Sequence, residues 1–393
     1  MPRSIWLLAI ATTINVTGGS FLWPLNTIYM HNVLGQSLAF AGMILMFNQL
    51  AAVLGNLLGG FLYDRYSAYR SILIATSIAL TAAFVLTFHH SIVPYSILLI
   101  VIGFGNGITW PIMFAMAGSL WPDGGRKAFN AVYVAQNLGV AMGATLSGYV
   151  ASISFDYIFG ANAFFIAIFF ILVLFTFKPL DKEKDRQMHT SVVGQRKKMR
   201  FGASFTALAT LCLGFLFIHI SYAQWQSTIA SYTQHIGIPV EQYSTIWAIN
   251  GFLILLTQPL VQWFTNRVTS GKAHIYIGTT IMIGSFLVVM HAEAFTMFAV
   301  AMAILTLGEV LMWPAFPTLA NELAPKGREG LYQGLVNSIA TIGRMTGPLL
   351  GGFIVDYYNM EILFYILLVL LLIPYFTTFF YDKRLQEKQG GYS

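Results

Sequence analysis

The sequence predicts an all-α membrane protein of twelve transmembrane helices, arranged as two pseudo-symmetric bundles of six helices. Three observations lead to this prediction. Hydrophobic residues make up 57% of the 393 residues and charged residues only 9%, whereas roughly 25% of the residues of an ordinary soluble domain are charged. Apolar stretches long enough to cross a bilayer recur along the whole chain. The second half of the chain also repeats features of the first.

The apolar stretches are too long and too continuous for the strands of a membrane barrel, which run about 9–11 residues. The first stretch has no small-residue cleavage site near its end, so we expect a retained helix rather than a signal peptide. The twelve predicted helices cover residues 5–30, 38–63, 71–89, 95–119, 128–152, 157–178, 204–235, 240–264, 274–292, 295–321, 330–357 and 360–381.

The basic residues are distributed on one side of the predicted membrane. Twenty of the 21 lysines and arginines fall in the termini and in every second loop, and the remaining one, Arg344, lies inside a predicted helix. The positive-inside rule therefore places both termini in the cytoplasm. Because this bias explains the net charge of +6, the charge gives no reason to expect nucleic acid as a partner.

The polar stretch at residues 179–200 separates six predicted helices from six. We predict an N-terminal bundle at 1–178, a cytoplasmic linker at 179–200, a C-terminal bundle at 201–381 and a cytoplasmic tail at 382–393. At an offset of 202 residues, Asn48 aligns with Asn250. At an offset of 203 residues, identical residues align at Gly105, Trp110, Pro111, Ala117, Leu120, Pro122, Gly124, Leu146 and Gly148 of the first half. Such parallel repeats of six helices are typical of transporters.

The loop after the second predicted helix resembles a signature of the major facilitator superfamily, in which a glycine and three further residues are followed by Asp-Arg and a basic cluster. The matching residues are Gly60, Asp64, Arg65 and Arg70, and Ser67 stands where the family prefers glycine. A carboxylate at a helix end pairs with basic groups and stabilises the N-termini of neighbouring helices. The resemblance implies that these residues form a cytoplasmic latch.

The eleventh predicted helix resembles the antiporter signature of the same superfamily, which the family usually carries in its fifth helix. Small residues at intervals of four allow close helix approach, and proline bends a helix. The fifth helix here has only a reduced version of the signature, with Gly139 and Gly143. We expect a helix-packing motif at Gly343, Gly347, Pro348, Gly351 and Gly352.

A third resemblance links residues 306–314 in the tenth predicted helix, together with residues 135–138, to bacterial proton-coupled multidrug antiporters. In that group a glutamate after a Leu-Gly pair binds cationic drugs or protons, and Glu309 matches it. The arginine that the antiporters carry in their fourth helix is absent, with Ile100 at roughly that place.

Glu309 and Arg344 fall at matching depth in consecutive helices, roughly 20 Å from the cytoplasmic ends at 1.5 Å per residue. Each costs about 2.5–3.5 kcal/mol alone at the bilayer centre, so we expect the two side chains to pair. His219 falls at similar depth in the seventh predicted helix. We predict that Glu309, Arg344 and His219 couple transport to protons; the alternatives are a structural ion pair and a hydrogen-bonded packing histidine.

In the superfamily, helices 1, 4, 7 and 10 line the central cavity, so the resemblance implies substrate contacts from their polar and aromatic residues. Tyr222 and Gln226 are four residues apart and are expected to share a helix face. The candidate cavity residues are Asn15, Asn26, Tyr29, Asn106, Trp110, Tyr222, Gln226, Tyr232 and Trp313.

The sequence therefore predicts a secondary transporter in a bacterial cell membrane, exporting small amphiphilic or cationic compounds in exchange for protons by alternating access. A proton symporter or facilitator for a polar nutrient, a lipid or glycolipid flippase and a membrane receptor without transport remain as alternatives. No enzyme activity is expected, because Glu309 with Arg344 is not a pair of catalytic carboxylates. We expect a monomer whose partners are a small-molecule substrate, protons and membrane lipids, with no cofactor, metal or nucleic acid.

Overall fold

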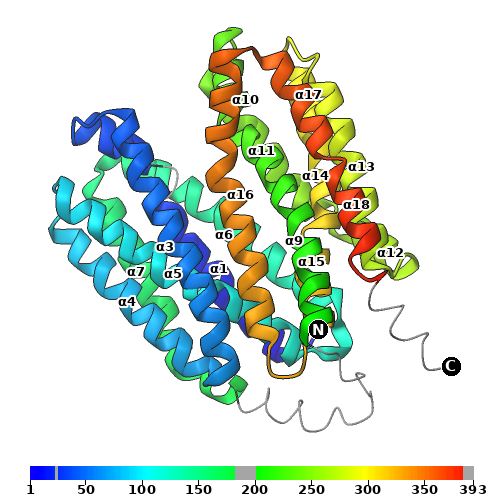
Figure 1. Cartoon of the computed structure of the whole chain (residues 1–393). Helices are drawn as coiled ribbons and strands as arrows, with labels where there is room; N and C mark the ends of the chain where they lie inside the picture. The colour runs from blue at the N-terminus through cyan, green and yellow to red at the C-terminus, as the bar shows by residue number, and fades with distance from the viewer. Residues whose placement is uncertain (23–24, 182–200, 384–393) are drawn as a thin grey trace. The chain divides into compact units, whose positions relative to one another are not determined.

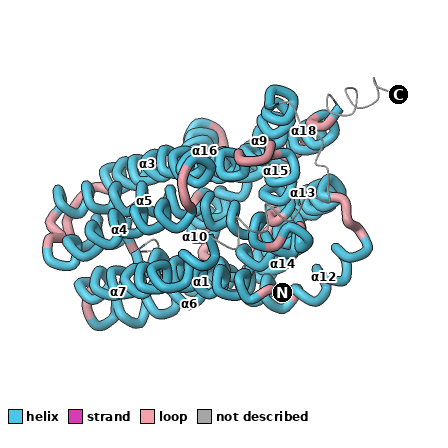
Figure 2. Tube along the Cα trace, turned by 90° about the horizontal axis from the view of Figure 1, so that it is seen from below, coloured by secondary structure: helices cyan, strands magenta, loops and turns pink. Residues whose placement is uncertain are grey.

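The computed structural model describes residues 1–22, 25–181 and 201–383, and all regular structure in these ranges is helical (Figure 2). The contacts divide the chain into two units (Figure 1). Unit 1 comprises Met1–Lys198 and Lys326–Ser338, and unit 2 comprises Met199–Pro325 and Ile339–Ser393. The switch near residue 199 falls in the predicted linker, of which residues 182–200 lie outside the described residues, as do residues 384–393 of the predicted tail. Lys326–Ser338 groups with unit 1 because its backbone contacts Gly60 and Asp64.

Unit 1 contains the first six predicted helices and the beginning of the eleventh. Its segments are α1 (Arg3–Leu22), α2 (Asn26–Ile28), the π-helix η1 (Tyr29–Val33), α3 (Leu38–Arg65), α4 (Ala68–Phe88), α5 (Ile92–Leu120), the 3-10 helix η2 (Pro122–Gly124), α6 (Arg126–Ile153), α7 (Asp156–Leu172), the π-helix η3 (Val173–Phe177) and the start of α16 (Glu329–Tyr357).

Unit 2 contains the rest of α16 and the remaining helices. They are α9 (Phe201–Ala223), the 3-10 helix η4 (Gln224–Gln226), α10 (Thr228–His235), α11 (Val240–Leu256), α12 (Gln258–Arg267), α13 (Gly271–Val289), α14 (Phe295–Met312), α15 (Ala315–Leu323), α17 (Met360–Leu370) and α18 (Ile373–Phe380).

The described helices match all twelve predicted membrane spans in position. Ten are long and apolar enough to cross a membrane, and the pair α11 and α12, bent by 52°, makes an eleventh. The 28-residue helix α6 occupies the fifth predicted span. It is less apolar than the others because it carries polar residues such as Asn130, Gln136 and Asn137.

Prolines explain most of the breaks within the predicted spans, because proline removes a backbone donor and disfavours helix in the preceding residue. The regular α-helix is interrupted ahead of Pro259, at Trp313-Pro314 and ahead of Pro374. The seventh predicted helix, residues 204–235, lies within one span at Gly202–His235. Its regular α-helix is interrupted, because α9 ends at Ala223 and Ser227 has a non-helical backbone (φ −126°, ψ −83°). That break has no proline, and the side chains of Gln224, Ser227 and Thr228 form local hydrogen bonds across it.

The helix pairs repeat between the two units. In unit 1, α3 packs on α5 and α1 on α6, as Figures 1 and 2 show. In unit 2, α11 packs on α14, and α16 lies against α9 at Gly343 and Gly347. These are the same two pairs, helix two with helix four and helix one with helix five of each half. The structure of each unit therefore agrees with the duplication predicted from the sequence.

Candidate functional site

Glu309 lies one turn before the end of α14 and is only 2% exposed. The side-chain amide of Asn250, on α11, donates hydrogen bonds to Oε1 of Glu309 at 3.2 Å and to Oγ1 of Thr306 at 2.9 Å. Thr306 in turn donates to the carbonyl of Met302, one turn earlier in α14. A carboxylate inside a membrane protein is thus held by the neighbouring helix, as a buried charge requires.

Five aromatic side chains pack together next to this site, and we call Phe215, His219, Tyr222, Trp247 and Trp313 the aromatic cluster. His219 stacks on Trp313 with ring centroids 4.6 Å apart, and Tyr222 meets Trp313 edge to face at 5.4 Å. Trp247 and Phe215 add edge contacts to Tyr222 and His219, respectively. The Tyr222 hydroxyl donates a hydrogen bond to the Glu309 carboxylate. The cluster therefore combines π faces with one carboxylate.

Arg344 lies on α16 in the same unit, where its Nη2 donates to Oγ1 of Thr341 at 3.2 Å. It is close enough for its charge to act on His219 and Tyr222. His219 donates from Nδ1 to the carbonyl of Phe215 at 3.1 Å. The three residues predicted to couple protons are thus gathered around Tyr222, while direct pairing of Glu309 with Arg344 stays a prediction.

The glycine motif of α16 faces α9 over two turns. A Cβ atom added to Gly347 would lie 2.8 Å from Cβ of Ala223 and 2.9 Å from the carbonyl oxygen of Ile220. Gly343 lies against His219, and Gly351 against Gln224 and Thr228, whereas Gly352 has open space beside it. Pro348 is accommodated inside α16. The amide of Gln224 donates to the carbonyl of Gly347 at 2.7 Å, which fixes the two helices in register.

The other candidate cavity residues are distributed over both units. Asn15 is buried on α1, and Asn106 and Trp110 are half-buried on α5, all in unit 1. In unit 2, Tyr232 is half-buried and packs on Phe298, with ring centroids 6.5 Å apart. Gln226 is exposed in η4, so the prediction that it shares an α-helical face with Tyr222 is wrong, because α9 ends before it.

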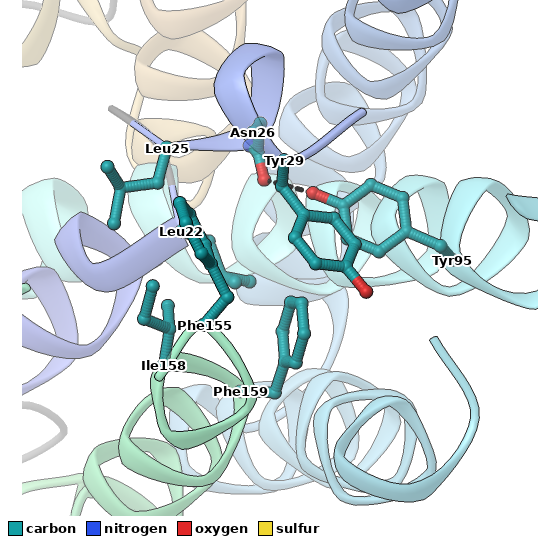
Figure 3. A pocket seen from close by; sticks show the side chains of 8 residues that line it. All are labelled: Leu22, Leu25, Asn26, Tyr29, Tyr95, Phe155, Ile158 and Phe159. Atoms are coloured by element: carbon teal, nitrogen blue, oxygen red, sulfur yellow. Dashed lines mark hydrogen bonds between the residues drawn. The ribbon is translucent and has the colours of Figure 1, made fainter. Parts of the chain in front are cut away.

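Asn26 and Tyr29 lie in an aromatic packing cluster (Figure 3). Oδ1 of Asn26 accepts a hydrogen bond from the Tyr95 hydroxyl at 2.7 Å, and Tyr29 packs on Tyr95, Phe155 and Phe159. The cavity beside them has a volume of about 10 Å³, room for about one water molecule. These contacts indicate a structural role within unit 1 rather than contact with a substrate.

Asp64 caps the beginning of α16 within unit 1. Its carboxylate accepts hydrogen bonds from the backbone N–H groups of Gly330 and Leu331, both at 2.7 Å. Gly60 lies against the backbone of Gly330, where a side chain would not fit. The side chains of Arg65 and Arg70 are exposed, and the Arg65 guanidinium lies 5.9 Å from the centroid of the Phe61 ring.

Ser67, the departure from the family signature, has a local function. Its hydroxyl accepts a hydrogen bond from the backbone N–H of Arg70 and so caps α4, and it donates to the carboxylate of Asp181. Asp181 also accepts from the backbone N–H of Ala68 at 3.2 Å. The end of the first half of the chain is thereby attached to the start of α4.

Sequence reasoning missed Asn250, Gln224 and Asp181 as members of the site. One signal was available for Asn250, since it aligns with Asn48 in the internal repeat. The contacts of Gln224 and Asp181 join residues more than a hundred positions apart, and nothing in the local sequence indicates them.

The comparisons with known proteins agree with this architecture. The family model of the Major Facilitator Superfamily matches residues 8–228 and again 211–391. The chain is 52% identical over 388 residues to an uncharacterized MFS-type transporter, YttB, of Bacillus subtilis, covering 98% of this chain and 97% of the relative. It is 23% identical to the multidrug resistance protein MdtH of Aeromonas salmonicida, covering 91% of this chain and 88% of the relative.

The structure is also similar to the crystal structure of the human organic anion transporter MFSD10. The TM-score is 0.77 at 14% identity, with 96% of this chain and 100% of that chain covered, which shows the shared fold. Both halves match the family model, and a relative at 52% identity spans almost the whole chain. The chain therefore belongs to the major facilitator superfamily of membrane transporters.

Proposed function

We propose that this transporter exports small amphiphilic or cationic compounds in exchange for protons, with Glu309 as the group that binds either the proton or the cation. The observation that carries the proposal is a 2% exposed carboxylate bonded to Asn250 and Tyr222 beside the aromatic cluster. Ionisable residues inside a membrane are rare and costly, and they mark substrate and ion pathways and proton relays. The similarity to a multidrug resistance protein supports the same substrate class.

The exchange follows from the chemistry of the carboxylate. In its charged form, Glu309 attracts an organic cation whose apolar part packs on Trp313 and Tyr222, and the ring faces add cation–π attraction. A proton that binds the carboxylate removes its charge and with it the attraction, so the cation is released. Loss of that proton on the other side of the membrane restores the charge. Each cycle thus exchanges one proton for one organic cation of single positive charge.

Arg344 and His219 are the second part of the proposed coupling device. A guanidinium near a carboxylate favours its charged form, whereas an apolar environment favours the protonated form. A conformational change that alters the distance from Arg344 to Glu309 would therefore drive proton uptake or release. We further propose that both termini are cytoplasmic, and that Asp64 with Gly60 acts as the latch that biases the conformations of the cycle.

Transport by purified protein in proteoliposomes tests the function. Ethidium, a lipophilic organic cation, is the probe, and its movement is followed with and without an imposed proton gradient. An exporter coupled to protons moves ethidium against its gradient only when protons run the opposite way. Ethidium movement in the same direction as the protons would indicate a symporter, and movement unaffected by the gradient would indicate a facilitator.

A further inference from the structure

The two units use a corresponding asparagine in different ways. Asn48 on α3 donates its amide to the backbone carbonyl of Leu99 on α5 at 2.6 Å, and Gly103 lies directly beside that amide. The repeat aligns Asn48 with Asn250 and, at an offset of 203, Gly103 with Thr306. In unit 2 the amide bonds to the Thr306 hydroxyl instead. The asparagine amide therefore contacts the backbone of the neighbouring helix in unit 1 and a side chain of the neighbouring helix in unit 2.

The second hydrogen bond of the Asn250 amide reaches Glu309, one turn further along α14. The position that aligns with Glu309 in the first half is Asn106, which is neutral. Unit 2 thus carries Thr306 and Glu309 where unit 1 carries Gly103 and Asn106. Both side chains of unit 2 accept from the Asn250 amide. The hydrogen bond to Thr306 fixes the orientation of the Asn250 amide, and the same amide also donates to the carboxylate of Glu309.

We propose that Asn250 is a positioning residue for the proton-binding carboxylate of Glu309, an assignment that rests on the function proposed above. An N–H group that donates to a carboxylate stabilises the charged form and fixes the direction of its oxygen atoms. Asn250 is 6% exposed, so water does not substitute readily for the lost donor. Removing the donor makes Glu309 bind a proton at a higher pH.

We expect the substitution of Asn250 to leave the titratable and charged groups near Glu309 in place. On α9, Tyr222 donates to the carboxylate, and His219 and Tyr222 both contact the ring of Trp313. On α16, Arg344 is the charged group that acts on Tyr222. Helix α13 packs the backbone of Gly278 against Gly308, the residue before Glu309. A change in the protonation of Glu309 after substitution of Asn250 therefore reports the lost amide.

Infrared spectroscopy of the purified protein measures this protonation without any transport. The C=O stretch of the protonated Glu309 side chain is the band that disappears in Glu309→Gln, and its intensity against pH gives a titration midpoint. Asn250→Leu keeps the side-chain volume and removes the donor. We expect the midpoint to move to higher pH by about one unit, a tenfold change in proton affinity.

The matched control is Asn48→Leu, which removes the corresponding amide from unit 1 and should leave the Glu309 midpoint unchanged. Asn250→Gln keeps an amide donor, so its titration midpoint should lie closer to that of the wild type than the midpoint of Asn250→Leu does. Asn250→Ala replaces the leucine variant if that variant does not fold. No shift in the variants without a donor, or the same shift in the Asn48 control, would overturn the proposal and leave Asn250 a structural amide.

The two proposals fail in different ways. If the midpoint shifts as expected but Glu309→Gln still drives ethidium export with the proton gradient, the proposed function is wrong and the positioning role stands. If Glu309→Gln abolishes coupling but the Asn250 variants do not shift the midpoint, only the positioning role is wrong.

Discussion

The imidazole of His219 stacks on the indole of Trp313, with ring centroids 4.6 Å apart and ring planes inclined by 23°. The stack fixes one face of the indole against α9. Tyr222 and Phe215 contact Trp313 edge to face, at 5.4 and 5.7 Å. Because its neighbours lock its orientation, Trp313 is suited to bind a flat organic cation beside Glu309.

Replacing Trp313 with alanine should weaken ethidium binding, because the variant loses both the ring face and the packing of His219 and Tyr222. A cation–π contact is worth about 0.5–2 kcal/mol, so we expect the Kd to rise roughly 2- to 30-fold. Fluorescence polarisation of ethidium with the purified protein measures this. Trp313→Phe keeps a smaller ring and should retain most of the affinity; equal binding by the alanine and wild-type proteins would remove Trp313 from the binding site.

Asp64→Asn should slow transport and leave ethidium binding intact. The substitution weakens two charge-assisted hydrogen bonds to the start of α16, each worth about 1.5–3 kcal/mol, so we expect a roughly tenfold slower turnover. Initial transport rates in proteoliposomes and binding in detergent give the two quantities. Asp123→Asn, at an exposed carboxylate in η2, is the control. A parallel loss of binding in folded Asp64→Asn protein would contradict a role in conformational bias.

Gly347→Leu should destabilise unit 2, whereas Gly352→Leu should be tolerated. A side chain at Gly347 meets Ala223 and Ile220, while Gly352 has open space beside it. Overpacking typically costs about 1–3 kcal/mol, which should lower the Tm of the purified protein by several degrees. Similar Tm values for the two variants would show that close approach of α9 and α16 at Gly347 does not matter.

The sequence was sufficient to predict the twelve helices, because each needs about 20 apolar residues and each side of the membrane has its own charge bias. It was also sufficient to single out Glu309, since a carboxylate in an apolar stretch is conspicuous. The partners of Glu309 were not predictable in the same way. Asn250 lies 59 residues before Glu309, and its donor reaches the carboxylate only through the register of α11 on α14.

Polar residues on helices 1, 4, 7 and 10 look alike in the sequence, whatever they contact. Asn26 and Tyr29 were predicted as cavity residues on the same grounds as Tyr222 and Trp313. In the structure, Asn26 bonds to Tyr95 in a packed cluster of unit 1, while Tyr222 bonds to Glu309. Only tertiary packing distinguishes the two cases, because an intramembrane amide or hydroxyl must find a partner in either role.

Glu309→Gln should abolish gradient-driven accumulation of ethidium and preserve passive exchange. Glutamine has nearly the same size and can still accept hydrogen bonds from Asn250 and Tyr222, so the fold of unit 2 is expected to persist. It cannot gain or lose a proton near neutral pH, so the proton gradient has no group on which to act. Ethidium should bind more weakly but still cross, because each conformation of the transporter can bind and release it on the side of the membrane to which that conformation is open.

The measurement compares accumulation under an imposed proton gradient with exchange of labelled ethidium at equal pH. Glu293→Gln, at an exposed carboxylate in the loop before α14, is the control and should behave like the wild type. If Glu309→Gln accumulates ethidium as well as the control does, the carboxylate is a structural partner of Asn250 and Tyr222. The proton would then have to be carried elsewhere, and His219, stacked on Trp313 in the same cluster, is the next side chain to replace.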